Sequence, residues 1–440
     1  MQYAEALDYI HGLQRFGSRL GLKRISRLLE AAGHPEEGLR VIHVAGTNGK
    51  GSVTAMVTAI LRAAGYSVGM YVSPFLEEFR ERIQMDGECI SEADLAHWAE
   101  LLRPLAERMG QECEEYPTEF EFVTLIALCY YAARRVDFAV LEVGLGGRYD
   151  ATNVVSDPVA CVISNIALDH TDRLGRTLGE IAFEKAGIVK AGRPVVTGAR
   201  EEEALRVIAQ VCGERDAPLY VAGRDFSWRE RHCDYRGQSI DLHGLRGFYP
   251  DLRLSLLGRH QQSNAACAVA ALEAGEVQGV DEMAIRRGLE TCRWPGRLEV
   301  LGQHPLVVID AAHNPDGVAA LTRALPLFPY RRLVAVLGIL KDKDAESMVA
   351  ALAPRADVLI ATAPTGSRAG RPERIAGLAR PYTGKVWAEA DITSALQMAL
   401  AEAGPEDMVL VAGSIYLVGP ARTWLRQHLL TEVAAPCRPA

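Results

Sequence analysis

The stretch from Val41 to Ala64, VIHVAGTNGKGSVTAMVTAILRAA, constrains this chain more than any other part of it. A short apolar run leads into a glycine-rich turn, and from Val53 onward apolar residues recur at helical spacing. Strand, glycine turn and helix together form a construction that binds phosphate. The glycines let backbone N–H groups approach the anion, and the helix N-terminus carries a partial positive charge. The stretch therefore predicts a phosphate loop over residues 46–52.

Two side chains of this turn favour a nucleotide over a purely structural turn. Lys50 adds a full positive charge for the phosphates, and Ser52 is placed to offer its hydroxyl to a magnesium ion. The match to the general pattern GxxxxGK[ST] is imperfect, because Val44 replaces the first glycine and Gly51 directly follows the lysine. A lysine with a hydroxyl two residues later nevertheless favours nucleotide phosphate.

Length and composition narrow the class of protein. A chain of 440 residues suggests two or three domains, and half of the residues are apolar, which is typical of a globular protein. The net charge of −8 argues against a general nucleic-acid surface. The nine cysteines form no CxxC pair, which disfavours structural zinc, and most of them lie in apolar runs, which favours core thiols over disulfides. No apolar run reaches membrane-spanning length, so we expect a cytoplasmic protein that binds neither membranes nor nucleic acids.

Three predicted strands end in polar residues. The strand 67–72 is followed by Ser73, the strand 136–143 ends in Glu142, and the strand 159–166 leads to His170. Because the carboxyl ends of parallel strands meet at one sheet edge, we expect these side chains beside the phosphate loop. Oxygen donors with one imidazole suit Mg²⁺ or Mn²⁺, although a lone histidine is more often structural.

The second half of the chain restarts an α/β alternation. A linker at 292–297 precedes an apolar strand ending in Asp310, and strands near 333–338, 358–361, 386–387 and 408–411 follow. Residues 224–251 suggest small antiparallel strands on the surface. We expect an N-terminal domain over 1–295 with a mainly parallel sheet and a smaller α/β domain over 296–440. By residue type alone, Lys185 is an ordinary solvated lysine and Asn264 an ordinary helix cap.

The ordered motifs resemble one family, the folylpolyglutamate synthases and dihydrofolate synthases of the Mur ligase superfamily. The resemblance covers nearly the whole chain. Its motifs are IHVAGTNGKGS, SPFL with FRERI, TEFEF, LEVGLGGRYDATN, NIALDHTD, EKAGIVK, QQSNAA, PGRLE, DAAHNP, KDKD and GSIY. It implies a P-loop ATPase domain followed by a smaller Rossmann-like domain. One departure is Phe75, where the family often has histidine.

The resemblance also implies roles for individual residues. Lys50, His170 and Lys185 match catalytic positions, and Lys185 matches a lysine that CO₂ converts to a carbamate. Magnesium at two sites is implied for Ser52, Ser73, Glu142, His170 and Lys185. The implied ATP contacts are Thr47, Asn48, Gly49, Lys50, Gly51, Ser52, Asn264, Arg297, Asp310 and His313. The residues implied to line a pterin or folate site are Leu20, Gly21, Leu22, Thr118, Glu119, Phe120, Glu121, Tyr149, Asp150 and Ala151.

The activity implied by the resemblance is ATP-dependent ligation of L-glutamate to the carboxylate of a folate through an acyl phosphate. Addition of the first glutamate to dihydropteroate is left open. A Mur-type peptidoglycan or poly-amino-acid ligase is the alternative, although about 40 residues before the phosphate loop are too few for a nucleotide-sugar domain. A nucleotide-dependent regulatory module is a third hypothesis. The implied partners are small-molecule substrates, and the family suggests a monomer.

Overall fold

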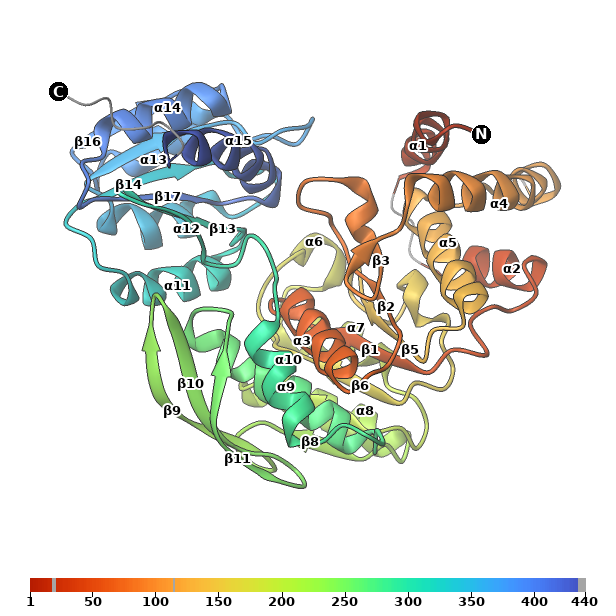
Figure 1. Ribbon diagram of the computed structural model, residues 1–440. Helices are drawn as coiled ribbons and strands as arrows, with labels where there is room; N and C mark the ends of the chain where they lie inside the picture. Colours follow the sequence, from red (N-terminus) through yellow and green to blue (C-terminus); the bar gives the residue numbers. More distant parts are fainter. Residues whose placement is uncertain (18–20, 114, 434–440) are drawn as a thin grey trace. The chain divides into compact units, whose positions relative to one another are not determined.

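The computed structural model describes residues 1–17, 21–113 and 115–433 (Figure 1). The predicted site residue Leu20 lies outside the described residues. The chain divides into two compact units. The first comprises Met1–Arg231, Ser239–Ser255 and Gln261–Cys292. The second comprises His232–Gln238, Leu256–His260 and the chain from Arg293 onward. The domain boundary after residue 295 stays a prediction.

The first unit is built on an eight-stranded sheet with the order β4-β3-β2-β5-β1-β6-β7-β8. Strands β2, β5, β1, β6, β7 and β8 run parallel, and β3 and β4 add an antiparallel edge. All five residues of β1 are buried, as expected for a central strand covered on both faces. The strands are β1 Val41–Ala45, β2 Val68–Tyr71, β3 Ile83–Met85, β4 Glu88–Cys89, β5 Phe138–Glu142, β6 Ala160–Ile163, β7 Val195–Thr197 and β8 Leu219–Val221.

Helices flank this sheet. Helix α3 begins at Lys50 because Gly49 adopts a positive φ of 86°, which turns the chain from β1 into the helix. Helix α10 packs closely on α3, and a β-carbon at Gly288 would lie 2.5 Å from the Cα atom of Ile60 (Figure 1). The helices are α1 Tyr3–Gly12, α2 Lys23–Ala31, α3 Lys50–Ala63, α4 Glu92–Cys113, α5 Glu119–Arg134, α6 Thr171–Leu174, α7 Leu178–Lys185, α8 Glu202–Glu214, α9 Arg259–Ala274 and α10 Glu282–Thr291. The 3₁₀ turns are η1 Leu13–Phe16, η2 Phe79–Arg82, η3 Ala151–Val154 and η4 Ala186–Ile188.

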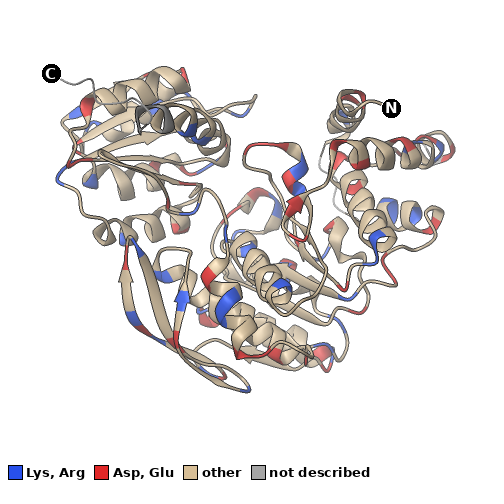
Figure 2. Ribbon diagram, in the orientation of Figure 1, with Lys and Arg blue, Asp and Glu red and all other residues tan. Residues whose placement is uncertain are grey.

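Acidic and basic residues are mixed along α4 (Figure 2). Arg103 contacts Glu107 one turn further on, and Asp94 contacts Arg134 of α5 at 2.9 Å. Such exposed pairs each add little to stability.

Of the described helices, none is long and apolar enough to cross a lipid bilayer.

The predicted small antiparallel sheet is present, with the order β11-β10-β9. Its strands are β9 Ser227–Asp234, β10 Gly237–His243 and β11 Phe248–Leu254. The tip of the β9–β10 hairpin belongs to the second unit, where Tyr235 packs on Phe328 with 6.4 Å between ring centroids.

The second unit contains a six-stranded sheet with the order β12-β13-β17-β14-β15-β16. The sheet is parallel except for the edge strand β12, which was not predicted. Together the two sheets confirm the predicted α/β class, with a Rossmann-like second half. The strands are β12 Glu299–Gln303, β13 Leu306–Asp310, β14 Leu333–Leu337, β15 Val358–Ala361, β16 Lys385–Ala388 and β17 Met408–Ala412. The helices are α11 Pro315–Ala324, α12 Ala345–Leu352, α13 Pro372–Ala379, α14 Ile392–Glu402 and α15 Ile415–Val433, with 3₁₀ turns η5 Leu325–Leu327 and η6 Ala353–Arg355.

Candidate active site

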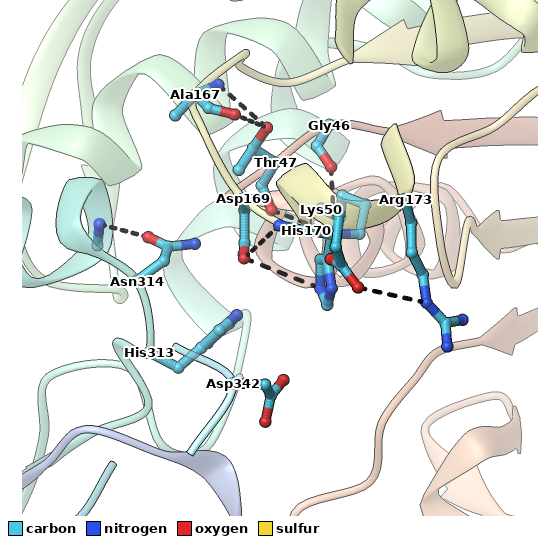
Figure 3. Close-up of polar contacts among 12 residues, drawn as sticks. Gly46, Thr47, Lys50, Ala167, Asp169, His170, Arg173, His313, Asn314 and Asp342 are labelled. Atoms are coloured by element: carbon cyan, nitrogen blue, oxygen red, sulfur yellow. Dashed lines mark hydrogen bonds and ion pairs between the residues drawn. The ribbon is translucent and has the colours of Figure 1, made fainter. Parts of the chain in front are cut away.

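The phosphate loop connects β1 to α3, as predicted from the sequence. The Lys50 ammonium folds back over the loop and donates to the carbonyl oxygens of Gly46 and Thr47, at 3.2 Å each (Figure 3). The N–H groups of the first helical turn, which begins at Lys50, have no carbonyl partner earlier in the helix. The loop therefore presents backbone donors and one cation, which together suit an anion.

The end of β6 holds this loop in place. Thr47 N–H donates to the Asn165 carbonyl at 2.8 Å, and Asn48 N–H donates to the Asn165 side-chain oxygen at 2.7 Å. The Ser164 hydroxyl donates to the Asn48 carbonyl at 2.6 Å. The Thr47 hydroxyl bonds both the N–H and the carbonyl of Ala167, at 3.0 Å each (Figure 3). Ser164 and Asn165 were not predicted as site residues.

Lys185 lies next to the phosphate loop, although 139 residues separate it from Gly46. Its side chain is buried, and its ammonium donates to the Gly46 carbonyl at 2.8 Å. Burial lowers the pKa of Lys185 to about 7, and the nearby positive charge of Lys50 contributes in the same direction. A substantial share of Lys185 is therefore a neutral amine near neutral pH, which is the form that reacts with CO₂.

Three of the five predicted metal residues, Ser73, Glu142 and His170, lie at or after the ends of strands of the parallel sheet. Glu142 is the last residue of β5 and is buried, and one of its carboxylate oxygens accepts from Ser73 N–H at 3.3 Å. His170 follows β6 with a positive φ of 49°, and its N–H donates to the Asp169 carboxylate at 2.8 Å (Figure 3). The structure thus joins Ser73 to Glu142, and it places His170 directly before α6, in the segment that follows β6.

This arrangement fits a magnesium ion better than a protein-only metal cage. Among the described residues, no three His, Cys, Asp or Glu side chains lie close enough together to hold a metal by themselves. Magnesium usually takes one or two carboxylates from the protein and fills its other positions with water and phosphate oxygens. The buried carboxylate of Glu142, on the strand beside the one that leads into the phosphate loop, matches that preference.

The segments predicted to line a pterin site meet around the turn 144–150. Gly21 N–H contacts the carbonyl of Tyr149 at 3.5 Å. A β-carbon at Gly144 would lie 2.6 Å from the Phe120 ring and 3.2 Å from the Asp150 carboxylate. Leu22 is half-buried, whereas Ala151 is buried. The structure therefore brings the leader, α5 and the glycine turn to one place.

Asp150 is fixed by a buried hydrogen-bond chain. Its carboxylate accepts from Leu145 N–H at 2.9 Å and from the Thr152 N–H and hydroxyl at 3.0 and 2.6 Å. Because the Thr152 hydroxyl donates to Asp150, its oxygen accepts from His43 Nε2 at 2.8 Å, so that nitrogen carries the proton. His43 Nδ1 is buried with no hydrogen-bond partner. Burial, with a smaller contribution from Lys190, lowers the pKa of His43 to about 3.

Two predicted pterin-site residues, Thr118 and Glu121, form a buried network with Arg24. Glu121 is buried and accepts from the Thr118 N–H at 2.8 Å and the Thr118 hydroxyl at 3.0 Å. It also accepts from Arg24 Nε at 3.1 Å, and the second guanidinium contact is 3.0 Å. Thr118 and Glu121 therefore hold the start of α5 against α2.

Arg82, which was not predicted as a site residue, contacts two of the predicted pterin-site residues, Glu119 and Phe120. Its guanidinium donates to Glu119 at 2.7 Å and lies 5.3 Å from the centroid of the Phe79 ring and 5.7 Å from that of Phe120. The side chain is nearly buried, so a charge stays close to the aromatic wall of the predicted pterin site. The signal was present in the sequence as the second arginine of FRERI.

Asn264 of α9 lies directly on the phosphate loop. A β-carbon at Gly49 would come within 2.5 Å of the Asn264 side-chain oxygen, and Gly49 also has a positive φ of 86°, so a side chain at this position would be strained. The Asn264 amide nitrogen donates to the Gln261 side-chain oxygen at 2.9 Å, which fixes which atom faces the loop.

The remaining predicted nucleotide contacts, Arg297, Asp310 and His313, belong to the second unit. The buried Asp310 carboxylate accepts from Leu298 N–H at 2.9 Å and from Ala312 N–H at 2.8 Å, so it shapes the turn after β13. His313 Nδ1 lies 3.0 Å from the Ala311 carbonyl. Contact of these residues with a nucleotide stays a prediction.

The chain is similar to known proteins along nearly its whole length. Residues 44–272 match the Mur ligase middle domain, and residues 296–415 match the Mur ligase glutamate ligase domain. The chain is 36% identical to "Dihydrofolate synthase/folylpolyglutamate synthase" of Bacillus subtilis, over 96% of this chain and 99% of that protein. It resembles the structure named "Mycobacterium tuberculosis Folylpolyglutamate synthase complexed with ADP" with a TM-score of 0.91 and 35% identity, covering 96% and 99% of the two chains.

A further relative is longer than this chain. It is the Halobacterium salinarum protein named "Probable bifunctional folylpolyglutamate synthase/dihydropteroate synthase", which is 39% identical over 98% of this chain. The chain spans about half of that protein, 53% of its length. From both domain matches and the end-to-end similarity, the chain belongs to the folylpolyglutamate synthase/dihydrofolate synthase family of the Mur ligases.

Proposed function

We propose that this chain uses ATP to join L-glutamate to the carboxylate of a folate, releasing ADP and phosphate. Addition of the first glutamate to dihydropteroate is proposed as a second activity of the same site. The names of the relatives support this assignment. The observation that carries it is the convergence of Lys50 and buried Lys185 on one carbonyl of the phosphate loop.

The chemistry explains why ATP is needed. An amine does not displace oxide from a carboxylate, so the carboxylate oxygen first attacks the γ-phosphorus of ATP and ADP leaves. The glutamate amine then attacks the acyl phosphate carbon and phosphate departs with its electron pair. In this proposal the loop residues Thr47–Ser52 bind the phosphates, and Lys50 balances the charge that develops during transfer. Asn264, Arg297, Asp310 and His313 are assigned as further nucleotide contacts.

We assign two magnesium positions to Ser52, Ser73, Glu142, His170 and Lys185. Bound magnesium would neutralise charge on the phosphates. Lys185 would contribute as a carbamate: its neutral amine attacks CO₂, a C–N bond forms and one proton leaves. The lowered pKa of Lys185 supports this step, because it increases the neutral form that can attack.

The pterin side of the substrate is assigned to the segments around the turn 144–150. Asp150, held rigid by Thr152, offers a carboxylate to ring N–H groups, and Phe120 offers a face for stacking. Gly21, Leu22, Glu119 and the Tyr149–Ala151 turn complete the proposed lining.

The test is a glutamate-ligation assay on the purified full-length chain. Tetrahydrofolate, dihydropteroate and a UDP-muramyl peptide are offered as acceptors with ATP, magnesium and L-glutamate. We expect folate-dependent ADP release and a product heavier by one glutamyl residue. Release driven only by the muramyl peptide would instead support a cell-wall ligase, and nucleotide binding without ligation would support a regulatory module. We further propose that the protein is cytoplasmic and monomeric. Analytical ultracentrifugation tests the oligomeric state.

A further inference from the structure

The conformation of the phosphate loop is determined by residues outside it. Both peptide groups that flank Asn48 are bonded to the segment that follows β6: the N–H of Asn48 to the Asn165 side chain and its carbonyl to the Ser164 hydroxyl. At 2.7 and 2.6 Å, both are short, well-formed hydrogen bonds.

The Ser164 bond determines where the Gly49 N–H points. The carbonyl of Asn48 and the N–H of Gly49 belong to one trans peptide group, in which they point in opposite directions. Since the carbonyl is bound by Ser164, the Gly49 N–H is directed away from β6. Gly49 immediately precedes α3, and the N–H groups of the first turn of this helix are available to bind an anion.

The Asn165 bond acts in the same way on the preceding peptide group. Because Asn165 accepts the Asn48 N–H, the Thr47 carbonyl is turned to the opposite side, where it accepts from the Lys50 ammonium at 3.2 Å. Asn165 thereby sets the position of Lys50 before nucleotide arrives.

Close packing leaves Ser164 little freedom. A β-carbon at Gly46 would lie 1.9 Å from the Ser164 hydroxyl oxygen, and one at Gly198 would lie 2.2 Å from the Ser164 carbonyl oxygen. Ser164 is also nearly fully buried, at 3% exposure. Two glycines therefore bring the serine to the loop, and neither position tolerates a side chain without movement.

We propose that Ser164 and Asn165 are positioning residues for nucleotide binding. By fixing the two peptide groups around Asn48, they aim the Gly49 N–H at the phosphates and hold Lys50 in place. This inference rests on the phosphate-loop assignment within the proposed function. It adds two residues that touch no substrate and act through the loop.

The experiment measures ADP binding to the full-length chain by isothermal titration calorimetry. Ser164→Ala and Asn165→Ala are compared with a matched control, Thr197→Val. Thr197 is fully buried, and its hydroxyl donates to the Ile163 carbonyl of β6 at 3.0 Å, one residue from Ser164. The control therefore removes two buried hydrogen bonds beside the end of β6, because the Thr197 hydroxyl also accepts from Ala199 N–H at 3.1 Å, and neither bond involves the loop.

We expect each of the two variants to weaken ADP binding about tenfold, or about 1.4 kcal/mol, and the control to stay within about twofold. In ligation assays, KM for ATP should rise while KM for glutamate stays unchanged. Melting temperatures are recorded for all three variants to show that each of them folds. If Ser164→Ala or Asn165→Ala does not fold, the other variant still tests the proposal.

ADP affinity equal to that of the wild type in Ser164→Ala and Asn165→Ala would overturn the inference. An equal loss of ADP affinity in the control Thr197→Val would also overturn it, because it would indicate a general loosening of the strand end. ADP binding requires no ligation. A wild-type chain that binds ADP without ligating glutamate would therefore refute the proposed function and leave this inference standing.

Discussion

Replacing His43 should remove one specific source of acid sensitivity from the protein. His43 is fully buried in β1, and its pKa lies at about 3 instead of 6.5. The unfolded chain therefore binds a proton that the folded chain excludes. The stability that follows from this difference is present above pH 6.5 and is lost as the pH falls toward 3.

The magnitude follows from the two pKa values. Between about pH 7 and about pH 5, His43 alone should lower the free energy of unfolding by about 2 kcal/mol, since one pKa unit corresponds to about 1.4 kcal/mol. His43→Gln removes the titration and keeps a donor near the position of Nε2, so Thr152 can still accept a hydrogen bond. Between about pH 7 and about pH 5, the free energy of unfolding of the variant should therefore fall by about 2 kcal/mol less than that of the wild type.

The assay is urea unfolding of both proteins at about pH 7 and about pH 5, which supplies the difference in unfolding free energy. NMR of histidine-labelled protein reports the ring directly, and we expect a neutral ring with its proton on Nε2 throughout this range. A His43 ring that titrates near its ordinary pKa, or an equal loss of stability in both proteins, would refute the argument from burial.

Three further substitutions test the site and its support. Lys50→Ala should abolish folate-dependent ADP release without unfolding the chain, because it removes the cation of the loop; unchanged turnover would remove the phosphate-loop assignment. Lys185→Ala should lose activity that formate or acetate partly restores, since a free carboxylate can replace the proposed carbamate, whereas full activity without additive would show that no carbamate is needed. Glu121→Gln should lower the free energy of unfolding by about 3 kcal/mol, because it leaves the buried Arg24 without its counter-charge. Urea unfolding measures this, and a loss under about 1 kcal/mol would contradict the importance of the pair.

Features encoded within a short stretch could be predicted from the sequence. The strand, turn and helix around Lys50 are local, and the apolar strands of both sheets appear in the sequence as short apolar runs. The strand β12 was missed because it is a half-exposed edge whose pairing with β13 is interrupted by a register shift between Val300 and Gly302.

Contacts between distant residues could not be predicted in this way. The approach of Lys185 to Gly46 depends on how α7 packs beside β1, and a lysine on a helix is ordinarily solvated. Asn165 was missed for a similar reason, because polar residues commonly follow strands, and only the folded loop reveals its bond to Asn48. His43 appears in the sequence as one polar residue within an apolar strand, with nothing to indicate Thr152 as its partner.

The division of the chain into units has a consequence for protein engineering. The chain passes from one unit to the other at residues 231, 238, 255, 260 and 292, so no single cut separates them. A fragment beginning at Arg293 would lack Leu257, which belongs to the apolar core of the second unit, and Tyr235, which packs on Phe328. Domain exchange between relatives therefore has to transplant the β9–β10 hairpin tip and the segment Leu256–His260 together with the C-terminal half.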